Sequence, residues 1–409
     1  MGSPEGPGAE DVSVLAADGF EAAGVACGIK GRGELDVSLV ATRDRAPVAA
    51  AGVFTTNRVQ AAPVLISKAH VKNGTAAAVV ANSGNANAAT GEAGRADARR
   101  MCTLAADALA CSPSDVLVCS TGLIGFPLPM AAVELGVPKA ADALAGTVEA
   151  AQHAAEALLT TDTVRKEATT RFEVGPTTVT VGGMAKGAAM LAPSMATMLA
   201  VITTDAAVSD QGLRAALGVA VDRSFNTLLV DGSKSTNDTV IALASGASGA
   251  RPLVAGTPEF RAFLEALTGV CTSLAEQMAH DAEGATKCAR LVVRGARTHG
   301  EARRAAHAVA ASQLVQCSLN GEDPYWGRIL SELGASGAFL DMEQVDIAYN
   351  GVTVCERGVA VGHDVDAVAE AMAGRDVDII CDLHQGSGRA TMLFTDLSHA
   401  YIDENRGTS

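Results

Sequence analysis

The chain has 409 residues, 48% of them hydrophobic and 19% charged, a composition that provides for a large buried core and excludes a disordered chain. At roughly one domain per 150 residues, this length allows two or three domains. The 31 basic and 46 acidic residues give a formal charge of -15, and only 3% of the residues are aromatic, so nucleic acids and anionic membranes are unfavourable partners.

Export, membrane insertion and metal binding are not indicated either. The first ten residues lack the basic and apolar segments of a signal peptide, and the apolar run at 198–203 is far shorter than the ~20 residues that cross a bilayer. Nine cysteines without a CxxC pair are typical of a reduced protein, and the eight histidines lack metal-ligand spacing. We therefore expect a cytoplasmic protein that holds no metal.

The first half of the chain alternates predicted strands and helices. Short β-branched runs at 37–40 and 78–80 indicate strands, and an apolar stripe at helical spacing indicates an amphipathic helix over 92–110. A second helix is predicted over 141–159. The next expected elements are strands at 171–174 and 178–181 around a Gly-Pro turn, a loop at 182–187 and a buried strand at 196–203.

The second half continues this mixture. Helices are predicted over 209–223 and 258–280, with a strand near 227–230 between them. Asn350 followed by Gly351 is a strong signal for a type I′ hairpin turn. The remaining expected elements are a strand at 286–295, a helix at 301–312, hairpin strands at 345–348 and 352–355, a helix at 365–373 and terminal strands.

The usual catalytic signatures, namely a P-loop, an HExxH zinc motif and GxSxG or SxxK nucleophile motifs, are absent. Thr197 stands out instead, because it is a polar residue followed by five apolar ones. Its hydroxyl is either that of an ordinary strand residue bonded to backbone or that of an N-terminal nucleophile. In the second case, a cut between Ala196 and Thr197 frees an α-amine, with a pKa of about 7.7 to 8.0, that serves as the base for the adjacent Oγ.

Motifs spread over the chain decide between these interpretations. Residues 183–206 read GMAKGAAMLAPSMATMLAVITTDA, and the chain also contains NSGNAN at 82–87, STG at 120–122, TTDT at 160–163 and DAEG at 281–284. Together these segments resemble the ornithine acetyltransferase family, the glutamate N-acetyltransferases of the cyclic arginine pathway. The resemblance implies self-cleavage before Thr197 and acetyl transfer from N-acetylornithine to glutamate, with release of ornithine, through an acetylated threonine.

The resemblance also implies a fold, a domain division and an assembly. The fold would be α/β, with stacked β-sheets flanked by helices as in N-terminal nucleophile enzymes. A catalytic lobe at 1–296 would carry the cleavage site, and a C-terminal α/β lobe would span 297–409. The fragments 1–196 and 197–409 would form an α2β2 assembly.

Individual site residues follow from the same resemblance. Thr197 would be the nucleophile, and Thr121 and Gly122 would form the oxyanion hole. Lys186 would bind a substrate carboxylate, and Glu283 would face the side-chain ammonium group of ornithine. The full set of implied substrate contacts is Thr160, Lys186, Thr197, Glu283, Asn405 and Ser409. No cofactor is implied, and the residues leave open whether acetyl-CoA serves as a co-substrate.

Some positions depart from the family pattern. Ala189 replaces a glycine, Ser233 an aspartate and Tyr325 an asparagine, and the C-terminal tail is short. Two alternatives therefore stay open. One is an N-terminal nucleophile amidohydrolase or aminopeptidase, in which water is the acceptor, and the other is an uncleaved paralogue that only binds a metabolite.

Overall fold

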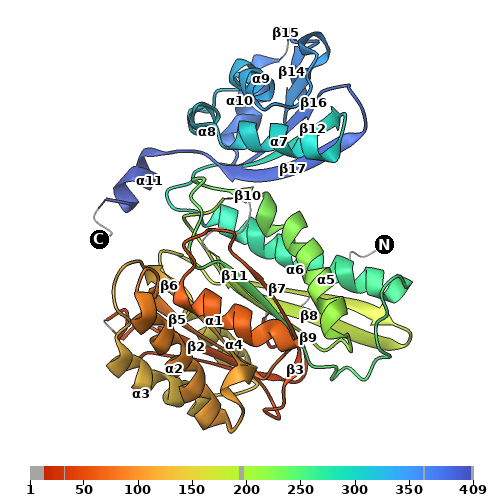
Figure 1. The fold of residues 1–409 in the computed structure, drawn as a ribbon. Helices are drawn as coiled ribbons and strands as arrows, with labels where there is room; N and C mark the ends of the chain where they lie inside the picture. Colours follow the sequence, from red (N-terminus) through yellow and green to blue (C-terminus); the bar gives the residue numbers. More distant parts are fainter. Residues whose placement is uncertain (1–12, 32, 193–197, 363, 407–409) are drawn as a thin grey trace. The chain divides into compact units, whose positions relative to one another are not determined.

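The computed structural model describes residues 13–31, 33–192, 198–362 and 364–406. The chain folds into two compact units (Figure 1). The first unit comprises residues 1–187, 194–226 and 234–278, and the second comprises 188–193, 227–233 and 279–409. Within the described ranges, no helix is long and apolar enough to cross a membrane.

Two sheets form the centre of the first unit. The smaller has the strand order β1 (Phe20–Val25), β2 (Val37–Thr42), β5 (Ala78–Asn85), β6 (Val116–Leu123). The larger has the order β4 (Thr75–Ala76), β3 (Val48–Phe54), β11 (Thr239–Ala244), β9 (Leu199–Thr204), β8 (Thr177–Lys186), β7 (Lys166–Val174). Phe20 and Leu117 of the smaller sheet share one hydrophobic core with Met184 and Ile241 of the larger, so the sheets are stacked.

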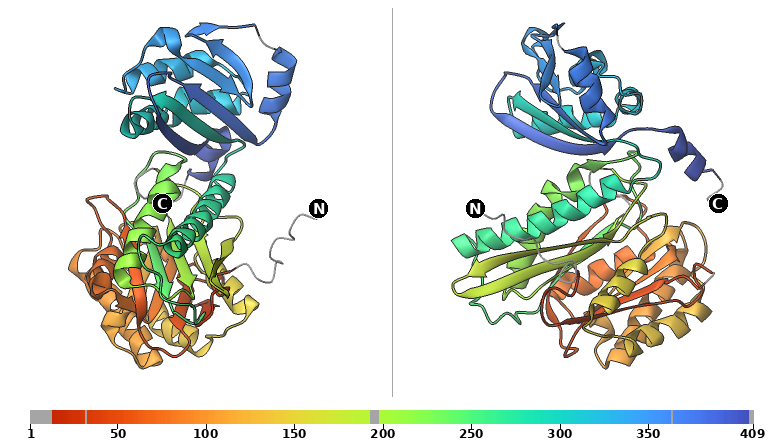
Figure 2. Two further views of the ribbon diagram at one scale, coloured as in Figure 1. Left: turned by 90° about the vertical axis from the view of Figure 1, so that its right-hand side faces the viewer. Right: turned by 180° about the vertical axis from the view of Figure 1, so that it is seen from behind.

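Helices cover the outer faces of both sheets (Figure 2). A second core joins the smaller sheet to α1 (Ala62–His70), α2 (Gly91–Leu109) and α3 (Met130–Asp142). The larger sheet packs against α5 (Asp210–Arg223) and α6 (Pro258–His280), and α4 (Val148–Glu156) packs on β1. This layering of helices, two sheets and helices confirms the predicted α/β fold of stacked sheets flanked by helices.

The amphipathic helix predicted over 92–110 is α2. Its buried residues Ala98, Met101, Ala105 and Leu109 recur every three or four positions, and all belong to the core under the smaller sheet. The helix ends where Ala110 adopts a left-handed conformation with φ 56°. Local periodicity was therefore sufficient to find this element.

The second unit is built on one sheet of seven strands. Their order is β10 (Leu228–Leu229), β17 (Gly388–Thr395), β12 (Cys288–Ala296), β16 (Asp376–Asp382), β13 (Asp346–Tyr349), β14 (Val352–Glu356), β15 (Val359–Ala360). The helices of this unit are α7 (His299–Ala310), α8 (Gln313–Asn320), α9 (Trp326–Ala335), α10 (Val365–Ala373) and α11 (His399–Glu404). Short 3-10 turns complete the chain at Val71–Asn73, Pro113–Asp115, Phe225–Thr227 and Met342–Gln344.

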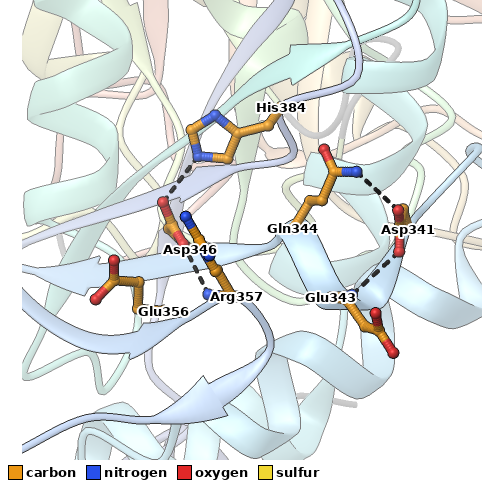
Figure 3. A pocket seen from close by; sticks show the side chains of 7 residues that line it. All are labelled: Asp341, Glu343, Gln344, Asp346, Glu356, Arg357 and His384. Carbon is orange, nitrogen blue, oxygen red and sulfur yellow. Dashed lines mark hydrogen bonds and ion pairs between the residues drawn. The ribbon is translucent and has the colours of Figure 1, made fainter.

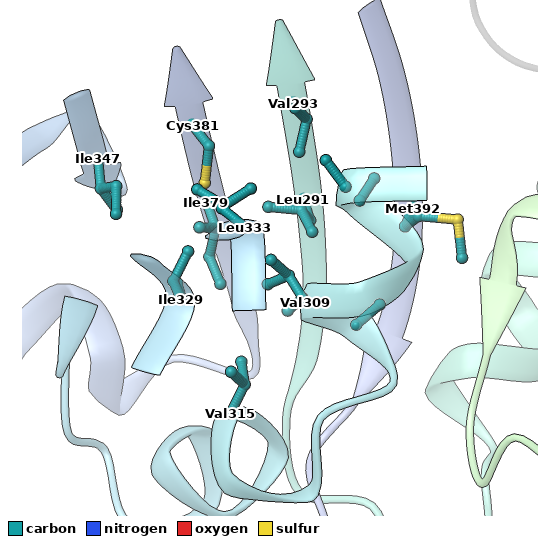
Figure 4. Packing of buried hydrophobic residues seen from close by; sticks show 14 of the residues in the cluster. Leu291, Val293, Val309, Val315, Ile329, Leu333, Ile347, Ile379, Cys381 and Met392 are labelled. Atoms are coloured by element: carbon teal, nitrogen blue, oxygen red, sulfur yellow. The ribbon is translucent and has the colours of Figure 1, made fainter. Parts of the chain in front are cut away.

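This sheet buries one face. Alternate residues such as Leu291 of β12 and Ile379 of β16 pack against Val309 of α7 and Leu333 of α9 (Figure 4). Several of the residues in between carry charge, and Arg290 of β12 pairs with Asp378 of β16 at 2.7 Å. The period of two therefore separates a buried apolar face from a more polar one.

Several expected elements agree with the structure, and others need correction. The Asn350-Gly351 turn is confirmed, with φ 47° and 84° at its two residues. The helix predicted over 141–159 is instead the end of α3 and a separate helix α4, because the Thr147 side chain accepts a hydrogen bond from the Ala150 amide and caps a new helix there. Near 227–230 only the two residues of β10 form a strand.

The prediction of a loop at 182–187 is wrong over most of its length, because residues 182–186 continue β8. Their small size reflects packing and not a turn. A Cβ at Gly182 would come within 2.3 Å of the backbone carbonyl oxygen of Ser13, so only glycine fits this close approach. As a result, Lys186 lies at the end of a buried strand.

Candidate active site

Lys186 is held in the first unit by contacts that fix its ammonium group. It pairs with Leu199 in the antiparallel register of β8 and β9 and is only 2% exposed. Its Nζ donates to Thr160 Oγ1 over 2.6 Å, and Thr160 itself is exposed to solvent. The structure therefore brings together two of the predicted substrate contacts, Thr160 and Lys186, at a place that solvent reaches.

Asp162 organises this cluster and was not singled out in the sequence. Its fully buried carboxylate accepts from Lys166 Nζ at 2.8 Å and lies 3.3 Å from Lys186 Nζ. It also accepts from the amides of Thr160 and Gly187. Burial alone would raise the pKa of Asp162, but the charges of Lys186 and Lys166 outweigh it and hold the pKa well below its usual range.

The cluster carries a net positive charge, because one carboxylate faces two ammonium groups. Lys30 is electrostatically coupled to this cluster: burial lowers its pKa, the charges of Glu34 and Asp36 raise it, and the charge of Lys186 lowers it. A buried charge is stable only when it is paired. The surplus positive charge at Lys186 and Thr160 therefore suits a ligand that carries a carboxylate.

Thr121 and Gly122, the predicted oxyanion pair, lie at the end of β6. Thr121 is 3% exposed. Gly122 has φ 134°, and a Cβ there would come within 2.3 Å of the Gly84 carbonyl carbon on β5. Both the backbone conformation and this close approach therefore require glycine at 122.

Replacing Gly122 tests this requirement. We expect Gly122→Ala to destabilise the protein by at least about 1 to 3 kcal/mol from backbone strain alone, measured by thermal unfolding. Gly218→Ala is the matched control, because Gly218 lies inside α5 with open space around its Cβ position, and we expect it to stabilise the protein by about 0.4 to 1 kcal/mol. Equal melting temperatures for the two variants would contradict the requirement for glycine at position 122.

The end of β6 and the start of β9 are tied to one turn before β11. Asn237 Nδ2 donates to the carbonyls of Ala86 at 2.7 Å and Ser120 at 2.8 Å. The next residue, Asp238, accepts from the Met198 amide at 3.1 Å through Oδ1. Asn237 and Asp238 thus fix the residue before Thr121 and the residue after Thr197.

Three positions of the predicted site lie outside the described residues, namely Ala196, Thr197 and Ser409.

In the second unit, the structure brings together Glu283 and Asn405, two of the predicted substrate contacts. Asn405 Nδ2 donates to Glu283 Oε2 over 2.8 Å, and Glu283 is 8% exposed. Asp231 and Tyr401 form a second pair in this unit, with the Tyr401 hydroxyl donating to Asp231 over 3.2 Å. Burial raises the pKa of Asp231, and the charge of Glu283 raises it as well. These acids suit a cationic group.

The substitution at Ala189 in this unit does not place a side chain on a left-handed backbone position. The left-handed conformation in this segment belongs to Met190, with φ 53°, and not to Ala189. Met190 is held there by its amide, which donates to Asp231 over 2.6 Å. A Cβ at position 189 therefore meets no left-handed backbone requirement.

Among known protein families, a model of the ArgJ family matches residues 21–407 of the chain. The chain belongs to the ArgJ family. This confirms the family that its motifs indicated.

Relatives cover nearly the whole of this ArgJ-family chain. The arginine biosynthesis bifunctional protein ArgJ of Symbiobacterium thermophilum is 48% identical over 394 residues, which are 96% of this chain and 97% of that protein. Its counterpart in Streptomyces coelicolor is 45% identical over 398 residues, 97% of this chain and 100% of that protein. A solved structure of ornithine acetyltransferase complexed with ornithine, from Mycobacterium tuberculosis, is 44% identical, covers 45% of this chain and 95% of that chain, and has a TM-score of 0.42.

Two other polar clusters occur in the second unit of this ArgJ-family chain. One is a cavity of about 580 Å³ lined by Asp341, Glu343, Gln344, Asp346, Glu356, Arg357 and His384, in which His384 contacts Asp346 at 2.8 Å (Figure 3). None of the predicted site residues lines it.

The other cluster groups His280, Cys288 and Asp376, whose potential ligand atoms lie within 4.8 Å of one another. Zinc accepts such donors. This group is not evident from sequence spacing, because the parallel pairing of β12 and β16 brings Cys288 beside Asp376. Its histidine and aspartate already form a pair at 2.7 Å, which accounts for their position without an ion.

Proposed function

We propose that this protein is a self-cleaving glutamate N-acetyltransferase that moves an acetyl group from N-acetylornithine to glutamate. The observation that carries the proposal is membership of the ArgJ family over residues 21–407, with relatives named as arginine biosynthesis bifunctional proteins. The positively charged cluster at Lys186 and Thr160 supports it, because both amino acid substrates carry carboxylates.

Maturation begins with an attack along the chain. Thr197 Oγ loses its proton and forms a bond to the carbonyl carbon of Ala196, while the bond from that carbon to the Thr197 nitrogen breaks and the nitrogen takes the proton. Water then hydrolyses the resulting ester. The products are a carboxylate at Ala196 and a free α-amine and hydroxyl on Thr197.

Acetyl transfer uses the same hydroxyl in two steps. Thr197 Oγ attacks the acetyl carbonyl of N-acetylornithine, its proton passes through the α-amine to the departing nitrogen, and ornithine leaves. The glutamate amine then attacks the acetyl ester, and its proton returns to Oγ. An amide is exchanged for an amide, so the site needs chiefly to stabilise the tetrahedral intermediates and exclude water.

The remaining roles belong to the same proposal. Thr121 and Gly122 donate to the oxyanion, a contribution of roughly 2.7 to 4 kcal/mol per donor. Lys186 and Thr160 bind a substrate carboxylate, and Glu283 binds the side-chain ammonium group of ornithine. Asn405 and Ser409 are the C-terminal contacts.

The domain division, the assembly and the second donor are part of the proposal as well. The predicted division assigns residues 1–296 to the catalytic lobe and 297–409 to the C-terminal lobe, whereas the compact units divide near residue 278 and β12 belongs to the sheet of the second unit. Two copies of each fragment assemble as α2β2. Acetyl-CoA is included as a second donor because the relatives are named bifunctional. Release of free CoA that depends on glutamate would support this part.

The proposal is tested by mass spectrometry of the purified protein before and after incubation with N-acetylornithine. We expect two chains, 1–196 and 197–409, and one acetyl group on the second chain that added glutamate removes as N-acetylglutamate. Acetate release at the same rate without glutamate would favour the amidohydrolase instead. A single chain of 41.3 kDa that never cleaves or acetylates would favour the metabolite-binding paralogue.

A further inference from the structure

Asp238 is a fully buried carboxyl group that neither the sequence motifs nor the proposed mechanism uses. It immediately precedes β11, and its main-chain carbonyl accepts from the Thr55 amide at 2.9 Å. Because β11 runs parallel to β9 with Thr239 opposite Leu199, Asp238 lies level with Met198. The register of two strands therefore places an acid beside the residue that follows Thr197 in the chain.

Both polar groups of the Met198 backbone are bonded to this turn. The Met198 amide donates to Asp238 Oδ1 at 3.1 Å, and the Met198 carbonyl accepts from the Thr239 amide at 3.1 Å. Met198 is 2% exposed, so water does not replace these bonds. The position and orientation of Met198 thus depend directly on the Asp238 side chain.

The second carboxyl oxygen has a different environment. Asp238 is 0% exposed, and its Oδ2 has no hydrogen-bond partner among the described residues. Burial raises the pKa of Asp238 to about 8, against the opposing effects of the Met198 amide, the Ser235 and Thr55 side chains and the charge of Lys186. Burial thus favours the neutral form of this carboxyl group, while Oδ1 accepts from the Met198 amide.

We propose that Asp238 is a positioning residue for self-cleavage, whose buried carboxyl group fixes the backbone of Met198, the residue bonded to Thr197 in the chain. This inference rests on the proposed function, because it requires cleavage before Thr197. The neutral form matters since an ionised Asp238 would place a negative charge beside Met198, the chain neighbour of Thr197, while the cleavage step itself develops negative charge on the Ala196 carbonyl oxygen. Raising the pH ionises Asp238, so its contribution is present below pH 8 and is lost above it.

The test measures cleavage of freshly made protein. Wild type, Asp238→Asn, Asp238→Ala and Thr197→Ala are made by cell-free synthesis with a short pulse of labelled methionine, and the appearance of fragments is followed at pH 7 and pH 9. Asn keeps an acceptor for Met198 and a donor in place of Oδ2, without a charge. We expect Asp238→Ala to slow cleavage at least tenfold and Asp238→Asn to recover most of the rate at pH 7.

The pH dependence separates positioning from simple stability. A group with a pKa near 8 is about ten times less protonated at pH 9 than at pH 7, so the rate ratio of Asp238→Asn to wild type should rise about tenfold over this range. Other titrations affect both proteins and cancel in the ratio. A ratio that stays constant would overturn the inference, as would a folded Asp238→Asn variant that fails to cleave at pH 7.

Asp205 provides the matched control at the other end of β9. It is 6% exposed, it accepts from the Thr180 amide at 2.8 Å, and burial raises its pKa too. We expect Asp205→Asn to cleave at the wild-type rate, with no change in its ratio to wild type between the two pH values. If Asp205→Ala slows cleavage as much as Asp238→Ala, the effect is general loosening of β9 and the inference fails.

The outcomes for the two proposals remain distinct. A wild-type protein that stays whole overturns the proposed function and this inference together. A wild-type protein that cleaves, together with a Thr197→Ala variant that does not and an Asp238→Ala variant that cleaves normally, overturns only the role of Asp238. If Asp238→Ala does not fold, judged by its melting temperature, the pH ratio of Asp238→Asn decides.

Discussion

Thr197→Ala is expected to abolish both chain cleavage and acetyl transfer. The variant has no oxygen to bond to the Ala196 carbonyl carbon, so it should remain a chain of 409 residues, and it has no atom to carry the acetyl group. Removing the nucleophile of an enzyme that forms a covalent intermediate costs at least about 10⁴-fold in kcat. Intact-mass measurement after exposure to N-acetylornithine, and the rate of N-acetylglutamate formation, are the two readouts.

Thr197→Ser is the control for this experiment. Serine keeps the hydroxyl and, once cleaved, the adjacent α-amine, so we expect both fragments and the acetyl adduct to return. The melting temperature of Thr197→Ala shows whether the uncleaved chain is folded. Acetyl transfer at the wild-type rate by the alanine variant would disprove the assignment of the nucleophile.

Lys186→Met should have the next largest effect, on both substrate use and stability. Methionine fills a similar volume but leaves Asp162 with Lys166 as its one remaining ammonium partner in the cluster. Breaking a buried pair costs about 3 to 5 kcal/mol of unfolding free energy. Loss of a charged hydrogen bond to a substrate carboxylate costs about 1.5 to 3 kcal/mol, so kcat/KM for glutamate should fall roughly 10- to 100-fold.

Lys166→Met separates the two effects of this substitution. Lys166 pairs with Oδ1 of the same carboxylate, whereas Lys186 pairs with Oδ2, and the hydrogen bond to Thr160 comes from Lys186 alone. We therefore expect the two variants to lose similar unfolding free energy, whereas the KM for glutamate rises in Lys186→Met alone. Equal increases in KM would mean that Lys186 only maintains the fold.

Residues outside the family motif hold the motif residues of the predicted site in position. The motif residues Thr121 and Lys186 lie on different sheets of the first unit, at the ends of β6 and β8. Asn237 holds the residue before Thr121, and Asp162 holds Lys186. The geometry of the predicted site thus depends on residues that carry no role in the predicted chemistry.

The sequence by itself determined the family, the choice of Thr197 and the elements whose signals are local. The stripe of α2 repeats every three or four residues, and the Asn350-Gly351 turn needs two positive φ angles that these residues tolerate. Small residues misled the same reasoning at Gly182, where close packing within a strand and a loop both favour glycine. Local patterns reveal what a segment prefers but not what lies against it.

The tertiary structure alone decided which charges are buried and what they hold. Asp162 and Lys166 are four residues apart, the spacing of ordinary ion pairs on helix surfaces. Both side chains are nevertheless 0% exposed and lie outside any helix. Lys186 and Thr160 are 26 residues apart, Asp238 and Met198 are 40 apart, and Asn237 and Ser120 are 117 apart. Strand order and register create these contacts, and burial then sets the pKa of Asp238, because desolvation depends on the packing of distant segments and not on the neighbours in the chain.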